Sequence, residues 1–305
     1  MAASRAPLAD GRWHFQHGPM DLVIGAEGDP AAVAAAHEAA WQRFVPLLGE
    51  LVAELPALRL PVGVDCPLQG RVARRMWQAC APHGAGFITP MAAVAGSVAE
   101  EVAACYARPG ITRAWVNNGG DIALHLAPGT AVRVGLYADV AQFDPLAFAR
   151  EGLRTDGHFD VLAAMPVRGI ATSGWRGRSF SLGIADSVTV LARTAAEADA
   201  CATVVANAVN IDDARIRRQA AQELKDDSDL GLLPVTVDVP PLGTEAVRHA
   251  LDAGLRVARQ LQDAGLLWAA ALVCQGQLVV AQNARWHALP HGVQLAQPQV
   301  GSVFA

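Results

Sequence analysis

Charged residues are scarce in this chain of 305 residues: only 17% are charged, whereas 52% are hydrophobic. A disordered protein needs low hydrophobicity and high net charge, so this composition excludes one. Lysine is almost absent, because Lys225 is the sole lysine among 24 basic residues, and the net charge is −5. The chain therefore lacks a basic field that would attract nucleic acid or an anionic membrane, and we expect it to bind neither.

Long hydrophobic runs are missing as well. The longest apolar stretches, 91–99 and 266–274, are too short to span a bilayer, and residues 1–20 contain no signal-peptide core. The five cysteines are scattered and include no Cys-x-x-Cys pair. This pattern is typical of reduced, mostly buried thiols, so we expect a cytoplasmic protein without a zinc centre.

Helix and strand patterns alternate along the chain. One helix begins after Asp29, a good N-cap residue, and Pro30; we expect it to reach residue 55 with an interruption near Pro46. Capping and apolar periodicity predict further helices over 70–81, 89–107, 194–209 and 244–265. Short β-branched or alternating runs predict strands over 21–25, 113–116, 122–126, 132–138, 169–174, 186–192, 234–239, 266–274 and 278–281.

Two segments have weaker patterns. Residues 56–67 contain three prolines, which favours a loop or an edge strand, and the charge-rich residues 212–229 favour a solvated helix or a mobile excursion. Many predicted strands lie close enough for hairpins, so we predict an α+β fold with mixed, largely antiparallel sheets and packed helices. We expect a single domain over 21–290, between an N-terminal segment (1–20) and a C-terminal tail (291–305).

A polar turn separates the strands predicted over 113–116 and 122–126. It consists of Asn117, Asn118, Gly119, Gly120 and Asp121. Two adjacent glycines can adopt positive φ and expose backbone N–H groups, which could cradle a phosphate. An Asn-Gly pair is also a common signal for a plain hairpin, and both interpretations remain open.

A second polar turn lies at the end of the strand predicted over 169–174. Thr172 and Ser173 supply hydroxyl groups beside Gly174, a combination that suits contacts to phosphate, ribose or the edge of a base. The alternative is an ordinary turn.

The predicted helix from residue 194 has a polar stripe. Thr194 and Glu197 form a capping box that fixes its start. Asp199, Thr203 and Asn207 then recur every four residues and share one face. A carboxylate and a hydroxyl one turn apart can bind a hard cation, although a solvated stripe on a surface helix is the alternative. An unpaired carboxylate facing a pocket adds little stability, so we expect Asp199→Ala to change stability by about 1 kcal/mol or less.

Several familiar catalytic motifs are missing. The nine histidines show no metal-ligand spacing, and the chain has no Gly-Lys-Ser of a P-loop, no nucleophile elbow and no Gly-x-Gly-x-x-Gly. P-loop, hydrolase and Rossmann interpretations therefore lose their main support.

Taken in order, the segments TPMAAVAGSVAEEV, NNGGDI, IATSG and ADSVTVLARTAAEADACATVVAN resemble a known family. The chain is similar to the uncharacterised cytosolic branch of the ApbE-like superfamily over most of residues 20–285. The better-known branch consists of FAD-dependent FMN transferases, which attach FMN to a protein threonine and need Mg²⁺. The resemblance implies an ApbE-like fold and a flavin nucleotide, FAD or FMN, as cofactor.

The resemblance also implies roles for individual residues. A Gly-Gly-Asp turn and a Thr-Ser-Gly turn line the flavin site of the transferases, which here implies a cofactor site formed by Asn118, Gly119, Gly120, Asp121, Thr172, Ser173 and Gly174. The transferases also carry Ala-Asp-Ala-x-Ala-Thr, whose Asp and Thr bind the metal. Asp199 and Thr203 match that pattern and are the implied Mg²⁺ ligands.

One segment departs from the transferases. They carry His-Ile-Ile-Asp-Pro-x-Thr-Gly before a Ser-Val-Thr-Val strand, whereas here residues 177–186, GRSFSLGIAD, lead directly into residues 187–190. The shorter segment fits the uncharacterised branch and removes residues that the transferases place near the flavin.

Three functions follow from this resemblance. The leading hypothesis is a protein that binds a flavin- or pterin-type cofactor and acts in cofactor biosynthesis or insertion, with pterin-dependent (tetrahydromethanopterin) one-carbon metabolism as one setting. The alternatives are a Mg²⁺-dependent FAD:protein FMN transferase and a non-enzymatic scaffold or carrier. We expect a small-molecule cofactor as partner and a homodimer, the commonest oligomer.

Overall fold

The computed structural model describes residues 2–136 and 157–283. These residues divide into two compact units. The first contains residues 2–132, 161–171 and 192–200, and the second contains the remaining described residues. The C-terminal tail predicted over 291–305 lies outside the described residues. Within these ranges, no helix combines the length and the apolar content that a membrane span requires.

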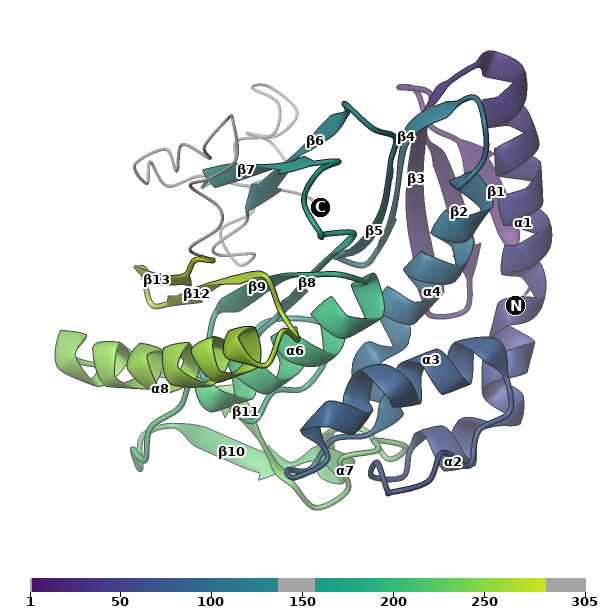
Figure 1. The fold of residues 1–305 in the computed structure, drawn as a ribbon. Helices are drawn as coiled ribbons and strands as arrows, with labels where there is room; N and C mark the ends of the chain where they lie inside the picture. Colours follow the sequence, from purple (N-terminus) through teal and green to yellow (C-terminus); the bar gives the residue numbers. More distant parts are fainter. Residues whose placement is uncertain (1, 137–156, 284–305) are drawn as a thin grey trace. The chain divides into compact units, whose positions relative to one another are not determined.

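The first unit is built on an antiparallel sheet (Figure 1). Its strands, in spatial order, are β1 (Ser4–Pro7), β2 (Trp13–His17), β3 (Met20–Gly28), β4 (Ile111–Asn118), β5 (Asp121–Leu126) and the first residues of β8 (Gly169–Ser173). β8 continues into the second unit after Ala171. β1 and β2 occupy residues 1–20, for which the sequence predicted only an N-terminal segment.

Helices cover one face of this sheet. They are α1 (Pro30–Ala53), α2 (Leu55–Leu58), α3 (Arg71–Cys80) and α4 (Val94–Ala103), with short 3₁₀ turns η1 (Ala81–His83), η2 (Pro90–Ala93) and η3 (Ala104–Tyr106). α1 packs on β2 and β3, α4 packs on β4 and β5, and α3 packs on α4. The Asp29 side chain caps α1 by accepting a hydrogen bond from the Ala32 N–H (2.9 Å), as predicted.

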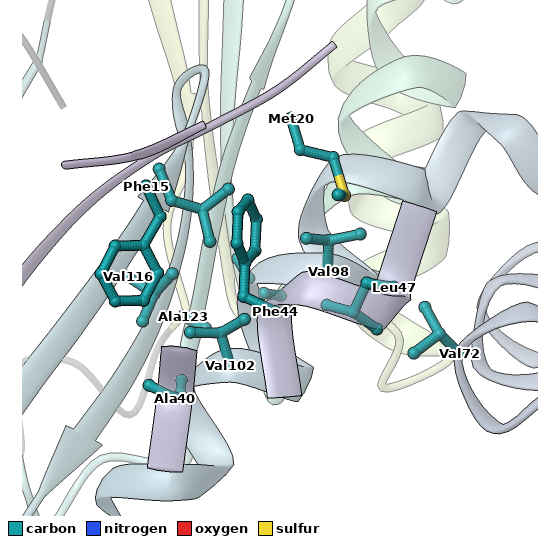
Figure 2. Close-up of a cluster of buried hydrophobic side chains, with 14 of the residues drawn as sticks. Phe15, Met20, Ala40, Phe44, Leu47, Val72, Val98, Val102, Val116 and Ala123 are labelled. Carbon is teal, nitrogen blue, oxygen red and sulfur yellow. The ribbon is translucent and has the colours of Figure 1, made fainter. Parts of the chain in front are cut away.

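The core of the first unit lies between these helices and the sheet. Figure 2 shows Phe15, Val116 and Ala123 from the strands beside Phe44 of α1 and Val102 of α4. The rings of Phe15 and Phe44 are 5.5 Å apart. Burial of such large apolar side chains is the main force that holds helices and sheet together.

The second unit contains three consecutive antiparallel strands and two separate strand pairs. The three strands are β9 (Ser187–Ala192), β12 (Ala269–Cys274) and β13 (Gln277–Ala281), with β12 between the other two. The strand pairs are β10 (Arg217–Ala220) with β11 (Pro234–Asp238), and β6 (Ala131–Leu136) with β7 (Gly157–Leu162). All registers defined for the described strands are antiparallel, so the predicted α+β fold with largely antiparallel sheets is confirmed.

Three further helices complete the described chain. They are α6 (Ala195–Ala208), α7 (Ala221–Leu224) and α8 (Thr244–Asp263). α6 begins in the first unit and ends in the second, and α8 packs on β12 and β13. A Cβ on Gly254 would lie only 2.3 Å from Val209 Cγ2, so glycine is what lets α8 approach the residue that follows α6.

The predicted interruption at Pro46 is wrong, because α1 runs through it. Pro46 is exposed, whereas Phe44 and Leu47 beside it are fully buried. Their packing offsets the hydrogen bond that a proline removes from a helix. The helix predicted over 89–107 also differs, since it starts and ends as the 3₁₀ turns η2 and η3, and only Val94–Ala103 is α-helical.

Other differences arise where an element depends on a distant partner. Residues 212–229 contain β10 and α7 instead of one solvated helix, because β10 pairs with β11. The strand predicted over 186–192 is confirmed as β9 (Ser187–Ala192), whereas the proline-rich segment 56–67 begins within α2. Arg75 of α3 is only 18% exposed because it forms ion pairs with Glu100 and Glu101 of α4.

Candidate functional site

The turn between β4 and β5 is a two-residue hairpin. Gly119 (φ 68°) and Gly120 (φ 112°) are both in the region that favours glycine, and Asn118 faces Asp121 across the strands. The Gly120 N–H donates to Asn117 Oδ1 (2.8 Å). The hairpin interpretation is therefore confirmed, and one N–H of the predicted phosphate cradle is already engaged within the turn.

Asn118 and Asp121 point toward the helix layer. Cross-strand partners share one face of a sheet, and these two follow the alternation of the core residues Val116 and Ala123. Asn118 is 6% exposed and Asp121 is 8% exposed. The Asn118 amide donates to the Ala95 carbonyl (3.1 Å), so it fixes the start of α4 against the end of the hairpin.

Asp199 meets the same turn of α4 from α6. The Gly96 N–H donates to Asp199 Oδ2 (2.9 Å), and the Ala95 N–H also contributes. This close approach depends on Gly96, because a Cβ there would lie 2.2 Å from the Ala195 carbonyl oxygen. Glycine at position 96 therefore admits the backbone at the start of α6 to this turn of α4.

The environment of Asp199 favours its neutral form. Desolvation raises the pKa of Asp199 to about 7, and the hydrogen bonds from Gly96 and Ala95 only partly oppose that rise. The carboxylate lies at the positive end of the α4 dipole, which likewise opposes the rise in its pKa. Asp199 is therefore a cap for the first turn of α4, which the sequence did not reveal, and its partners in the described chain include no cation.

Thr203 and Asn207 follow Asp199 on α6, and the three have different environments. Asn207 Oδ1 accepts hydrogen bonds from the Leu182 N–H (2.9 Å) and the Ser181 hydroxyl (3.2 Å), so it anchors that loop. Thr203 is partly exposed one turn after Asp199. In residues 2–136 and 157–283, no three His, Cys, Asp or Glu side chains gather as a metal site. An oxygen-liganded cation here would have only the Asp199 carboxylate and the Thr203 hydroxyl on this face of α6, and would need water or phosphate as its other ligands.

Thr172 and Ser173 are the last two residues of β8, and with Gly174 they belong to the second unit. Thr172 Oγ1 and Thr189 Oγ1 of β9 are 2.9 Å apart and share a hydrogen bond. Thr172 is exposed, Ser173 is partly exposed, and Gly174 is buried. A Cβ on Gly174 would lie 2.3 Å from the Asp186 carbonyl oxygen, so the turn is packed directly on the chain that leads into β9.

Asp186 organises the loop after β8, although no sequence pattern pointed to it. Its side chain is 6% exposed and accepts a hydrogen bond from the Trp175 indole N–H (3.3 Å). It also accepts from the Gln275 N–H and lies 3.5 Å from Arg176 Nε, while the Arg176 guanidinium stacks on the Trp175 ring. A single Asp before a strand has no distinctive pattern, because its partners come from distant positions.

Similar proteins occur among methanogenic archaea. The chain is 37% identical over 213 residues to the UPF0280 protein of Methanopyrus kandleri, covering 68% of this chain and 78% of that one. It is 32% identical to a UPF0280 protein of Methanosarcina acetivorans, covering 68% and 75% of the two chains.

Solved structures of low sequence identity also align with the chain. The apo form of the flavinyl transferase ApbE from Pseudomonas stutzeri aligns with a TM-score of 0.46 and 13% identity, covering 94% of this chain and 95% of that one. The flavin transferase ApbE from Vibrio cholerae aligns with a TM-score of 0.45 and 11% identity, covering 94% and 98%.

The family described as "AbpE bacteria" matches residues 5–280. This range contains every motif on which the ApbE-like resemblance depends, and it includes both units of the structure. The chain therefore belongs to this ApbE-like family and is a relative of the UPF0280 proteins.

Proposed function

We propose that this chain binds a flavin- or pterin-type cofactor, foremost a flavin nucleotide such as FAD or FMN, and acts in cofactor biosynthesis or insertion. Its membership of an ApbE-like family supports this function. The observation that carries it is Asp199, a partly buried carboxylate whose described partners are backbone N–H groups. Perturbed carboxylates of this kind concentrate at functional sites.

The proposed ligand contacts are the two glycine-containing turns. In the first unit, Gly119 is exposed at the tip of the hairpin that begins at Asn118 and ends at Asp121, where it can approach a phosphate closely. In the second unit, the Thr172 and Ser173 hydroxyls beside Gly174 are accessible and can donate to phosphate or ribose oxygens. These contacts need no side chain longer than two carbons, which suits a bulky cofactor.

Mg²⁺ is part of the proposal. Asp199 would hold the ion through Oδ1, since Oδ2 already accepts from Gly96, and the Thr203 hydroxyl would be the second ligand. When bound, Mg²⁺ neutralises phosphate charge. An ion at this place would also restore the ionised form of Asp199, whose pKa desolvation raises.

Titration of the purified protein with FMN and FAD, with and without Mg²⁺, tests the proposal. We expect binding that Mg²⁺ strengthens, and Asp199→Asn should remove the Mg²⁺ effect while keeping a hydrogen-bond acceptor for Gly96. Glu197→Gln is the matched control, because it neutralises another carboxylate of α6 that pairs with Arg193. If the wild-type protein binds none of FAD, FMN or pterins, the proposed function is rejected.

Transfer activity needs a separate experiment. The protein would be incubated with FAD, Mg²⁺ and a protein acceptor that contains an exposed threonine, and the acceptor mass would then be measured. We expect an unmodified acceptor, because residues 177–186 lack the segment that transferases carry. An increase in acceptor mass equal to one attached FMN, with AMP released from FAD, would instead show a transferase.

A further inference from the structure

The face of β2, β3 and β4 that points away from the helices carries side chains other than those of the core. Phe15, Leu22 and Val116 face the helices, so the residues that alternate with them face away. His14, Val23 and Asn117 form one row across the three strands on this outer face. Two residues after Val23 on β3, Gly25 lies opposite Trp115 of β4.

Trp115 lies with the face of its indole on Gly25. A Cβ on Gly25 would lie 2.1 Å from Cζ2 of the indole and 2.4 and 2.6 Å from the two ring atoms bonded to it, Cε2 and Cη2. A point directly above one ring atom is nearly equidistant from its neighbours, whereas an approach along the ring edge would leave both much farther away. The ring therefore lies flat on the backbone, and its other face points away from the sheet.

Polar groups lie on the same outer face as this indole, in neighbouring rows of the sheet. His14 Nε2 and Asp21 Oδ1 are 2.7 Å apart, and both side chains are about one-third to one-half exposed. Arg113 and Glu27 form an ion pair (2.7 Å) on the other side of Trp115. Trp115 and Asn117 are themselves partly exposed. A flat aromatic surface with hydrogen-bonding groups at its edges suits a planar ring that carries ring nitrogens and carbonyl groups.

We infer that Trp115 is a stacking surface for the planar nitrogen heterocycle of the cofactor, with Asn117 and the His14–Asp21 pair near the ring edge. This inference rests on the proposed function and adds the position of the ring. Trp115 lies three residue steps before the end of β4 at Asn118, about 10 Å along a strand. One flavin nucleotide can therefore stack on Trp115 and extend its phosphate toward the Gly119–Gly120 turn.

Gly25 is essential to this arrangement. A side chain at position 25 would occupy the space of the indole, so Trp115 could no longer lie flat on β3. The alternative is purely structural: the indole would cover the backbone at Gly25 and bind nothing. The two possibilities differ in whether substitution of Trp115 changes the affinity and the fluorescence of a bound flavin.

The experiment measures binding of riboflavin and FMN to the full chain, together with quenching of flavin fluorescence. Stacking on an indole quenches that fluorescence, and aromatic stacking of a base typically changes affinity by about tenfold or more. We expect Trp115→Ala to weaken binding of both ligands about tenfold and to abolish quenching. Trp115→Phe should retain affinity within about threefold.

Two further variants separate stacking from folding. Gly25→Ala keeps the indole but displaces it, and should weaken riboflavin binding about as much as Trp115→Ala. Trp77→Phe changes a partly buried tryptophan on α3 and should leave both readouts unchanged. Circular dichroism would show that each variant is folded.

The outcomes separate this inference from the proposed function. If the wild-type protein binds FMN but folded Trp115→Ala retains its affinity and quenching, the stacking surface is refuted and the proposed function stands. If the wild-type protein binds neither riboflavin nor FMN, flavin binding fails, and the inferred ring position fails with it.

Discussion

Asp199 in the first unit and Asp186 in the second are both carboxylates in crowded surroundings, but their partners differ. Asp186 lies beside the Arg176 guanidinium and also accepts from Trp175 and Gln275. Asp199 accepts from the backbone of Ala95 and Gly96. A carboxylate paired with a cation is balanced by its own chain, whereas one held by N–H dipoles alone can still gain from a bound cation. The comparison therefore distinguishes a structural carboxylate from a candidate ligand.

The largest effect is expected at Asp186. Asp186→Ala would remove the acceptor shared by Trp175, Arg176 and Gln275, and should lower the free energy of unfolding by about 3 kcal/mol. Urea denaturation followed by circular dichroism measures this. Glu245→Gln, which removes one member of an exposed ion pair on α8, is the control and should have little effect. If Asp186→Ala lowers the free energy of unfolding no more than Glu245→Gln does, the pairing of Asp186 with Arg176 does not stabilise the loop.

Asp199→Ala should have the second-largest effect, about 2 kcal/mol, because the first turn of α4 would lose its cap. The structure thus replaces the expectation of about 1 kcal/mol or less, since the carboxylate accepts from Gly96. Asp199→Asn should restore most of this stability but not the Mg²⁺ dependence of FMN binding. Equal stability of Asp199→Ala and wild type in urea would show that α4 needs no cap from α6.

Glu101 offers a third carboxylate with which to sharpen the comparison, because it is paired with three arginines, Arg43, Arg71 and Arg75. Burial alone would raise the pKa of Glu101, but Arg43 and Arg75 lower it by more, and the net pKa lies below its ordinary 4.5. A carboxylate of lowered pKa stabilises the fold above its ordinary pKa and loses that contribution as the pH falls through its folded value.

We therefore expect the free energy of unfolding of the wild-type protein to decline as the pH falls below about 4.5. In Glu101→Gln the decline should be shallower, although the variant is less stable at neutral pH. Urea midpoints measured from pH 7 to pH 3 provide the test. Parallel pH profiles for the two proteins would contradict the pairing of Glu101 with Arg43 and Arg75.

The smallest stability change is expected at Thr203. Thr203→Val keeps the shape of a partly exposed side chain and should change the free energy of unfolding by less than about 0.5 kcal/mol. It should nevertheless weaken Mg²⁺-dependent FMN binding, because one oxygen ligand is lost. If Thr203→Val changes neither Mg²⁺-dependent FMN binding nor stability, Thr203 is not a ligand, and Asp199 is left as the one side-chain ligand of the proposed Mg²⁺ site.

Features that depend on neighbouring residues could be predicted from the sequence. The Asp29 cap, the Gly119–Gly120 turn and the Thr194 cap, which accepts from the Glu197 N–H (3.2 Å), each involve residues within three positions of one another. Sequence patterns at this range translate directly into turns and helix ends. The family motifs likewise marked the candidate residues.

Features that depend on distant partners could not be predicted. β10 is extended because it pairs with β11, Asp199 is a cap because α4 meets α6, and Trp115 lies flat because it faces Gly25. None of these contacts leaves a periodic signal in the sequence, and tertiary packing overrides local propensity at each of them.

The capping of α4 by Asp199 also affects how the chain is synthesised. The hydrogen bond joins Gly96 to a residue 103 positions later. At a translation rate of roughly 5–20 residues per second, the ribosome needs about 5–20 s to reach Asp199 after it has made Gly96. During that interval the first turn of α4 lacks its acceptor, so the nascent first unit cannot reach its final stability until α6 has emerged.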